Sequence, residues 1–492
     1  MNIHGAKSDV SSLAKAKRSS TRLHPDRLLP ADPGLRQIAR ALYQEVANAP
    51  LLCPHGHCEA GWFAQNAPFP NATDLLVTPD HYVLRMLASQ GISYDALGLQ
   101  SKNGSPSKTD PRDVWRLFAE HYYLFRGTPS RVWMDHALHE ILDVPDVLTA
   151  ETADAAFDYI NQKLSEPAFR PRALFDQFNI ELLATTDAAT ATLADHKALE
   201  AEGFSGIIPT FRPDQLSNPL RPDFIDAMKA LADQTGEDIA QWRGFLSAVR
   251  MRRQAFIALG ATATDHGVFY PNTVNLPAGQ CQQLLDAALA QTITEEEAAL
   301  FEAQLLFEMA RMSVEDGLVM QIHAGSRRNY STPIFETYGL DMGFDIPSPT
   351  VWVEGLKPML DAFGFEPNFH VILYTLDETT YSRELAPLAG AFPSITLGAP
   401  WWFFDSPDGM RRYRSAVTET AGFYNTAGFV DDTRAFLSIP ARHDMFRRVE
   451  AGNLARLVAE QALREDEALE VMNALAVDLA RRAYRIPTRE MS

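Results

Sequence analysis

The sequence predicts a (β/α)8 barrel of the TIM type, with a helical insertion after the first strand. Short apolar runs typical of buried strands recur along the chain, helical patterns separate them, and each run ends in polar residues. Eight buried strands that alternate with helices favour a closed parallel barrel over a doubly wound sheet, which usually has fewer strands. The predicted strands are LLCPHGH (51–57), IELLATTD (180–187), GIIPTFR (206–212), GATATDHG (260–267), LVMQIHAG (318–325), FHVILYTLD (369–377), SITLGAPWW (394–402) and GFVDDTR (428–434).

The remaining segments follow in order around these strands. Residues 1–25 are basic and Ser-rich without an apolar core, which predicts a flexible tail. Apolar residues at helical spacing predict a first helix over 33–50. The aromatic-rich stretch 59–175 predicts the helical insertion, and 454–484 predicts further helix after the last strand. Because no repeat or low-complexity linker divides the chain, we expect 26–492 to form one domain.

Composition excludes several function classes. The chain has 492 residues, of which 46% are hydrophobic, so it buries a large core. A net charge of -19 argues against a nucleic-acid partner, because phosphate binding needs a basic face. No apolar run reaches the ~18 residues that a membrane span requires. Three cysteines, Cys53, Cys58 and Cys281, indicate a reducing compartment, so we expect a cytoplasmic protein.

The sharpest local signal is PHGH at the end of the first predicted strand. Alternate side chains share a face of a strand, so His55 and His57 project together and can bind one divalent ion. Asp432, at the end of the last predicted strand, is the candidate third ligand. It can also hold a proton for a bound water, or form an ion pair with Arg434 on the same face.

Three arginines form a second group of candidate site residues. Arg212, Arg328 and Arg434 lie at the ends of three different predicted strands. The guanidinium group pairs with carboxylate through two hydrogen bonds, so these residues together indicate an anionic substrate. Any one of them taken alone is more often a surface or structural ion pair.

Other polar residues near the strand ends are less specific. Asp80 is a candidate N-cap of the helix that follows it, and Tyr82 is a candidate core aromatic. Trp401 and Trp402 are candidates for a pocket wall or for simple packing. A Walker loop, a GxGxxG after a strand and a GxSxG are all missing from the sequence, so nucleotide binding and serine hydrolysis have no support.

Taken together, these motifs resemble the successive motifs of the uronate isomerases (glucuronate isomerases) of the amidohydrolase superfamily. The resemblance extends from about residue 28 to about residue 484. The motifs are HGH (55–57), PDHYVLRML (79–87), TTDAATATLADH (185–196), IIPTFRPDQ (207–215), ATDHG (263–267), QIHAGSRRN (321–329), GAPWWFFDSPDGM (398–410) and DDTRAFLSIPARHDMFRR (431–448).

The resemblance implies a barrel that holds one divalent metal, typically zinc, and that binds a small hexuronate in a homo-oligomer. The implied metal ligands are His55, His57 and Asp432. The residues for which it implies catalytic roles are Tyr82, Asp432, His323 and Asp265. Those expected to bind substrate are His81, Arg212, Arg328, Trp401 and Arg434.

The chain departs from the family pattern at two places. It has Arg327 and Arg328 before Asn329 where relatives often have a single arginine; we assign the substrate role to Arg328 because it directly precedes Asn329. The first strand carries Pro54 and Gly56 where relatives often show an aromatic and an Asp before the first histidine, which predicts an altered local backbone.

Three function hypotheses follow. The leading one is aldose–ketose isomerisation of D-glucuronate to D-fructuronate and of D-galacturonate to D-tagaturonate through an enediol. The alternative is a one-metal hydrolase of the same superfamily, a lactonase or deacylase. A two-metal hydrolase needs a bridging Lys or Glu and a further His on the middle strands. It is disfavoured because no Lys ends a predicted strand and the sixth strand ends in Tyr374 and Thr375 where a His would be needed. A non-catalytic sugar-acid binding protein is the third, and it needs neither a metal nor a base.

Overall fold

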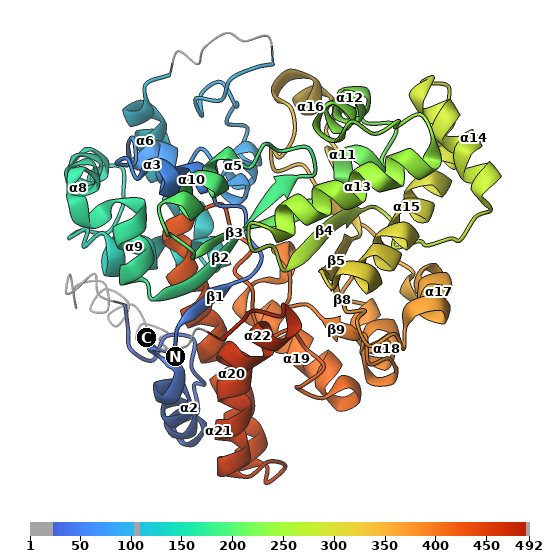
Figure 1. Ribbon diagram of the computed structural model, residues 1–492. Helices are drawn as coiled ribbons and strands as arrows, with labels where there is room; N and C mark the ends of the chain where they lie inside the picture. Colours follow the sequence, from blue (N-terminus) through green and yellow to red (C-terminus); the bar gives the residue numbers. More distant parts are fainter. Residues whose placement is uncertain (1–22, 103–108, 489–492) are drawn as a thin grey trace, which may run out of the picture.

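The computed structural model describes residues 23–102 and 109–488, and its centre is one curved sheet of seven parallel strands (Figure 1). Neighbouring strands in the sheet follow their order along the chain, so every connection is a crossover of the kind that helices fill. The strands are β1 (Leu51–Cys53), β2 (Ile180–Ala188), β3 (Ile207–Arg212), β4 (Ala263–Val268), β5 (Val319–Ala324), β8 (Val371–Thr375) and β9 (Ile395–Leu397).

The segment predicted as the eighth strand, 428–434, closes the barrel without forming a regular strand. On one side, the N–H of Ala427 donates to the carbonyl of Leu397 at the end of β9, at 2.8 Å. On the other, the N–H of His57 donates to the carbonyl of Thr433 at 3.0 Å. The predicted (β/α)8 fold is therefore confirmed, but the prediction of a regular last strand is wrong.

Left-handed backbone explains the irregularity of this segment. Gly428 has φ 71° and Asp432 has φ 40°, and neither conformation fits the extended ladder of a strand. The segment keeps the place of a strand while its carboxyl end turns away from regular pairing.

The predicted helical insertion lies between β1 and β2. Its core is aromatic, with Trp115, Phe118 and Phe63 fully buried. Its helices are α3 (Ala60–Gln65), α4 (Ala72–Leu76), α5 (His81–Ala88), α6 (Pro111–Glu120), η1 (Tyr122–Phe125), α7 (Pro129–His136), η2 (Ala137–Ile141), α8 (Ala153–Ser165), η3 (Pro167–Phe169) and α9 (Pro171–Gln177).

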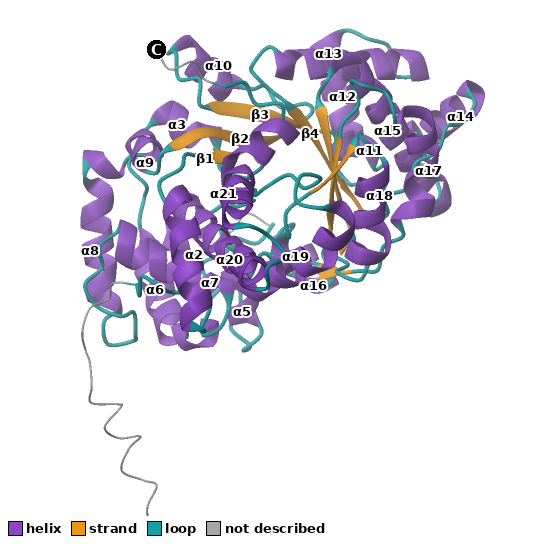
Figure 2. Cartoon of the chain, turned by 90° about the horizontal axis from the view of Figure 1, so that it is seen from below, coloured by secondary structure: helices purple, strands orange, loops and turns teal. Residues whose placement is uncertain are grey.

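Helices cover the outside of the sheet, and the strands lie inside them (Figure 2). β5 is buried along its whole length, as expected for a strand of a barrel covered by helices. The helices from β2 to α20 are α10 (Ala194–Ala201), α11 (Asp214–Ser217), α12 (Phe224–Thr235), α13 (Trp242–Ile257), α14 (Ala278–Leu289), α15 (Glu295–Asp316), α16 (Thr332–Tyr338), α17 (Trp352–Phe363), η4 (Tyr381–Leu385), α18 (Ala386–Ala391), η5 (Trp402–Phe404), α19 (Pro407–Ala421), η6 (Phe436–Ser438) and α20 (Ile439–Ala459).

The two ends of the described chain pack together. The predicted first helix is α2 (Pro33–Val46), which lies against α20 and α21 (Glu465–Asn473). The last helices of the described chain are η7 (Ala474–Asp478) and α22 (Leu479–Ala483).

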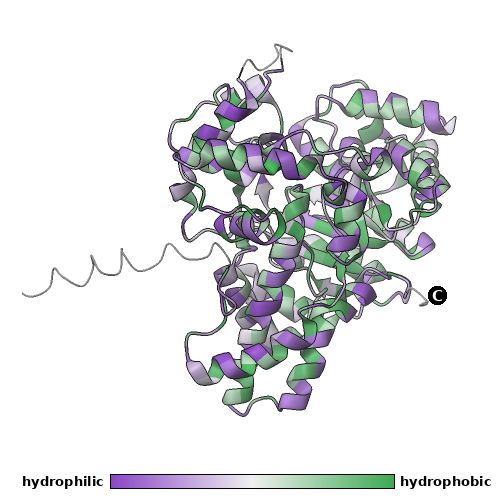
Figure 3. Cartoon of the chain, turned by 90° about the vertical axis from the view of Figure 1, so that its left-hand side faces the viewer, coloured by the Kyte–Doolittle hydropathy of each residue, from purple (hydrophilic) through white to green (hydrophobic). Residues whose placement is uncertain are grey.

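Many of the outer helices are hydrophilic on their exposed side and hydrophobic toward the interior (Figure 3).

A short hairpin interrupts the connection between β5 and α17. β6 (Ser326–Arg327) pairs antiparallel with β7 (Ile346–Pro347), and α16 lies between them. This connection carries Arg328 and therefore part of the predicted site.

The predicted tail and the predicted single domain are not tested by the described residues. Most of the predicted tail, residues 1–22, lies outside the described residues, and the single domain over 26–492 stays a prediction. Among the helices within 23–102 and 109–488, none is long and apolar enough to cross a membrane.

Gly398, directly after β9, tests the packing of the barrel interior. A Cβ at this position would lie 2.3 Å from Cε1 of Tyr374, a buried ring that stacks on His323. We expect Gly398→Ala to lower the free energy of unfolding by roughly 1–3 kcal/mol, because overpacking forces neighbouring groups to move. Urea denaturation measures the change.

Gly279→Ala is the matched control. Gly279 lies in α14, and a Cβ there meets nothing within 4 Å. This substitution should raise the free energy of unfolding by up to about 1 kcal/mol, since alanine is the better helix former. Equal stabilities of the two variants would show that the space beside Tyr374 is not as tight as described.

Candidate active site

A cavity of about 1020 Å³ opens at the carboxyl ends of the strands. Functional residues of a barrel of this kind are expected at this end, because the loops after the strands converge there. Every residue predicted to form the site lines the cavity: His55, His57, His81, Tyr82, Arg212, Asp265, His323, Arg328, Trp401, Asp432 and Arg434. The structure brings these residues together, and their individual roles stay predictions.

The predicted metal ligands meet at one carboxylate oxygen. Oδ1 of Asp432 lies 3.3 Å from Nε2 of His55 and 3.0 Å from Nε2 of His57. His323 joins them, since ligand atoms of His55, His323 and Asp432 all lie within 4.8 Å of one another. Gly56 points away: a Cβ there would face Asp431 rather than the imidazoles.

Unpartnered polar atoms show that this cluster fits a cation. Although Oδ1 of Asp432 lies close to both imidazoles, it accepts no well-oriented hydrogen bond in the described chain, and Nε2 of His323 is likewise buried without a partner. Leaving such atoms without a partner is costly, and a bound ion removes the cost. Imidazole nitrogen and carboxylate oxygen are ligands that zinc and related divalent metals accept. The donor set therefore fits one divalent metal.

Charge in the cluster is concentrated on the carboxylates. Burial by itself raises the pKa of Asp432, but His55 and His57 overcome it and hold that pKa well below the ordinary value. Burial also lowers the pKa of His57, against the attraction of Asp432. Burial also lowers the pKa of His55, but the attraction and hydrogen bonding of Asp432 outweigh it, so this pKa is raised. Metal binding requires an ionised Asp432 and neutral imidazoles, so a metal ion and a proton compete at His55.

A second buried carboxylate orients His323. Nδ1 of His323 donates to Oδ1 of Asp265 at 2.7 Å, and Nη1 of Arg212 lies 3.0 Å from Oδ2 of the same residue. Burial raises the pKa of Asp265, yet Arg212 and His323 together hold it well below the ordinary value. With Nδ1 donating to Asp265, Nε2 of His323 is left to act as an acceptor toward the cavity.

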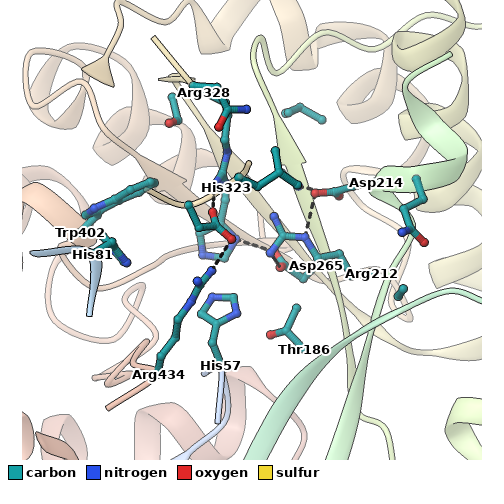
Figure 4. Close-up of a pocket in the computed structure, with 18 of the residues that line it drawn as sticks. His57, His81, Thr186, Arg212, Asp214, Asp265, His323, Arg328, Trp402 and Arg434 are labelled. Carbon is teal, nitrogen blue, oxygen red and sulfur yellow. Dashed lines mark hydrogen bonds and ion pairs between the residues drawn. The ribbon is translucent and has the colours of Figure 1, made fainter. Parts of the chain in front are cut away.

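The three predicted arginines come from different parts of the chain, with Arg212 at the end of β3, and they surround the cavity (Figure 4). Nε of Arg212 donates to Oδ2 of Asp214 at 2.7 Å, and Nη2 of Arg434 donates to Oδ2 of Asp341 at 2.8 Å. Arg328 lies with its guanidinium 5.4 Å from the ring centroid of Trp402.

These contacts decide one question that the sequence left open. Arg434 pairs with Asp341 and not with Asp432, whose oxygen faces the histidines. Nη1 of Arg328 lies 3.5 Å from Oδ2 of Asp345. Each arginine thus has an acidic neighbour, and its remaining N–H groups are available to an anion in the cavity.

Helix α5 of the insertion delivers His81 and Tyr82. Asp80 is its N-cap, as predicted: the N–H of Tyr82 donates to the Asp80 side chain at 2.8 Å. The Tyr82 hydroxyl lies 3.1 Å from the carbonyl oxygen of Trp402 and 3.2 Å from Oδ2 of Asp405. Burial, with Asp405 nearby, raises the pKa of Tyr82 well above its ordinary value, so this phenol keeps its proton.

His81 and Trp401 complete the wall of the cavity. Burial lowers the pKa of His81 to about 3, so its ring is neutral, and its Nε2 is buried without a partner among the described residues. The ring of Trp401 meets His323 edge to face, at 4.7 Å between centroids. Both side chains lie beside the metal-ligand cluster.

Several residues that the sequence reasoning missed also line the cavity. Asp214 and Asp341 anchor arginines, and Glu302 projects from α15. Asp214 could have been predicted as a site residue, since it follows Arg212 and Pro213 in a motif already noted. Glu302 could not have been predicted from the sequence, because it lies within a helix whose other residues mostly belong to the buried core.

Comparison with known proteins identifies the family of this chain. A family model described as glucuronate isomerase matches residues 34–483. The chain belongs to the glucuronate isomerase family. The resemblance predicted from the motifs is thereby confirmed, and the hydrolase alternative is not favoured.

Members of the glucuronate isomerase family match nearly the whole chain. The uronate isomerase of Phenylobacterium zucineum is 54% identical over 94% of this chain and 97% of its own. The crystal structure of glucuronate isomerase from Caulobacter crescentus superposes with a TM-score of 0.94, at 50% identity over 96% of this chain and 98% of that one. The uronate isomerase from Thermotoga maritima gives a TM-score of 0.87 at 28% identity, covering 94% and 99%.

Removing both histidines of the HGH motif tests the metal site. We expect a folded His55→Ala, His57→Ala double variant to retain much less divalent metal than the parent, because two of the ligand atoms around Oδ1 of Asp432 are lost. Metal analysis of the purified proteins measures the difference. His139→Ala is the control, since His139 is buried in the insertion and does not line the cavity. Equal metal content in parent and double variant would eliminate this site.

Glu302 predicts a pH dependence of stability. Burial, with Asp214 nearby, raises its pKa from 4.5 to about 8, so the folded state binds a proton more tightly than the unfolded state does. Its stabilising contribution is full below pH 4.5 and is lost as pH rises through 8. Relative to Glu302→Gln, the parent should lose at least about 1 kcal/mol of unfolding free energy between pH 5 and pH 9, since one pKa unit corresponds to roughly 1.4 kcal/mol. Parallel pH profiles in urea denaturation would contradict this.

Proposed function

We propose that this protein is a uronate isomerase that interconverts D-glucuronate with D-fructuronate and D-galacturonate with D-tagaturonate through an enediol. One observation carries the proposal. In a chain of the glucuronate isomerase family, a single cavity joins the His55–His57–Asp432 cluster to three anchored arginines. The first group suits chemistry at the sugar carbonyl, and the second suits a substrate carboxylate.

The substrate carboxylate is expected to bind the arginines. Arg212, Arg328 and Arg434 line the cavity and retain N–H groups beyond those that bind their acidic neighbours. A fixed guanidinium recognises a carboxylate through paired hydrogen bonds, which a neutral hexose cannot form. The cavity is therefore selective for sugar acids.

Isomerisation moves a proton from carbon 2 to carbon 1, and the protonation states in the cavity support the following proposed roles. Asp432 is ionised and accepts a proton through its carboxylate oxygen. Tyr82 is a protonated phenol and donates to a sugar oxygen as charge develops there. His81 is neutral, and its unpartnered Nε2 hydrogen-bonds a substrate hydroxyl.

We also propose that the resident metal is zinc, held by His55, His57 and Asp432 with His323 beside it. When bound, zinc acts as a Lewis acid toward the carbonyl and hydroxyl oxygens of the sugar. Asp265 supports the centre by fixing the orientation of His323.

A cytoplasmic location and a homo-oligomeric state complete the proposal. Cys53, Cys58 and Cys281 are all free thiols, which supports a reducing compartment. The homo-oligomer stays a prediction from the family resemblance.

Turnover of sugar acids tests the proposed reaction. The metal-loaded protein should form a ketose from glucuronate and from galacturonate, and none from glucose or galactose. In heavy water the ketose should carry deuterium at carbon 1, or, where the proton is shielded from solvent, the carbon-2 proton should reappear there. No ketose from either uronate with folded, metal-loaded protein would overturn the proposal, and release of an acid or amine with consumption of water would indicate a hydrolase.

Tyr82→Phe tests the proton donor. The change removes one hydroxyl, so the fold should persist, while turnover of glucuronate should fall by about 100-fold or more if that hydroxyl moves a proton. Tyr122→Phe is the matched control: its buried hydroxyl donates to Asp135 within the insertion and does not line the cavity. Full activity of Tyr82→Phe would remove Tyr82 from the mechanism and leave Asp432 as the candidate for proton transfer.

A further inference from the structure

Arg442, which lines the cavity, forms a buried ion pair with Asp405 that has no role in the proposed chemistry. Asp405 directly follows η5, and Arg442 is in the first turns of α20. Nη1 of Arg442 donates to Oδ2 of Asp405 at 2.7 Å, and both side chains are almost fully buried. Their partners suggest a function.

Asp405 holds the hydroxyl of Tyr82. Oδ2 of Asp405, which accepts from Arg442, also lies 3.2 Å from the Tyr82 hydroxyl. The carbonyl oxygen of Trp402 lies 3.1 Å from the same hydroxyl. Trp402 has φ 53°, a left-handed conformation that is strained for a bulky side chain. The backbone and the carboxylate together fix the direction in which the phenol points.

Arg442 connects this arrangement to the metal-ligand cluster. The same Nη1 donates to the carbonyl of Asp431 at 3.2 Å, and Nε donates to Oγ of Ser438 at 3.1 Å. Asp431 directly precedes Asp432, so one guanidinium holds both the carboxylate beside Tyr82 and the backbone that carries Asp432.

The pair is poorly arranged for stability alone. Oδ1 of Asp405 is buried without a hydrogen-bond donor among the residues described. Burial raises the pKa of Asp405 to about 7 even though Arg442 opposes the shift. A buried ion pair is often no more stable than apolar packing in its place, and incomplete hydrogen bonding makes it less so.

We propose that Asp405 and Arg442 are positioning residues that fix the hydroxyl of Tyr82 and the carboxylate of Asp432 relative to each other. The inference rests on the proposed isomerase function and deepens it, because these two groups are the proposed proton donor and acceptor. Small displacements of such groups slow proton transfer more than they weaken binding.

Asp405→Asn tests the proposal, since it keeps the shape of the side chain and removes its charge. We expect kcat for glucuronate to fall by about tenfold or more, KM to change by less than about threefold, and metal content to stay equal. In a Tyr82→Phe background the same substitution should cause little further loss, because it acts through that hydroxyl.

Glu450→Gln is the matched control. Glu450 forms another buried ion pair, with Arg414 at 2.9 Å between α19 and α20, and neither residue lines the cavity. It should lower Tm while leaving kcat unchanged. An unchanged kcat in Asp405→Asn, or full additivity with Tyr82→Phe, would overturn the proposal. If Asp405→Asn alone fails to fold, the Asp405→Asn, Arg442→Gln pair, which removes both charges, serves in its place with the same expectations.

A readout independent of turnover separates this proposal from the proposed function. In protein labelled with 13C at tyrosine Cζ, the Tyr82 resonance is identified by its loss in Tyr82→Phe. It should shift in Asp405→Asn and not in Glu450→Gln. If the resonance does not shift in Asp405→Asn, the positioning role is overturned, even if the protein isomerises uronates. If the resonance shifts but the protein forms no ketose, the positioning of Tyr82 stands and only the proposed reaction is refuted.

Discussion

Backbone hydrogen bonds between the residues directly after β1 and the segment that follows α19 hold His55 and His57 beside Asp432. The His57 N–H donates to the carbonyl of Thr433, and the Asp432 N–H donates to the carbonyl of His55 at 3.3 Å. These bonds join the first and last positions of the barrel, so a carboxylate near the end of the chain meets two imidazoles near its beginning. The direction of β1 places the imidazoles at the carboxyl rim, and the left-handed φ of Asp432 allows its oxygen to face them.

Electrostatics organises the rest of the cavity around this contact. The chain carries a net charge of -19, yet its cavity contains several arginines. Acidic neighbours fix these arginines in place, and ionised Asp265 and Asp432 offset part of their charge. A sugar acid therefore enters a site in which donors and acceptors are already oriented, which limits the reorganisation needed during the reaction.

Sequence patterns predicted much of this arrangement because they depend on local periodicity. The seven regular strands, the helical insertion and the residues at strand ends all follow from apolar runs and what ends them. The regular eighth strand was wrong because the backbone at Gly428 and Asp432 is left-handed, which an apolar run does not reveal. Asp341 was missed because its partner Arg434 lies 93 residues later. Asp405 lies in a motif already noted, but its pairing with Arg442 exists only in the folded chain. Contacts of this kind depend on tertiary structure, and a single sequence carries no local sign of them.

Joining the first and last positions of the barrel also governs when the site is assembled. During synthesis, His55 and His57 emerge early, but their carboxylate partner is residue 432 of 492. A chain that has not been made past Thr433 lacks both the oxygen between the imidazoles and the hydrogen bonds that close the ring of strands. Contacts over such a sequence distance form late and slowly. Truncated or nascent chains therefore lack the Asp432 carboxylate, and the cluster that fits a metal is complete only once translation is nearly finished.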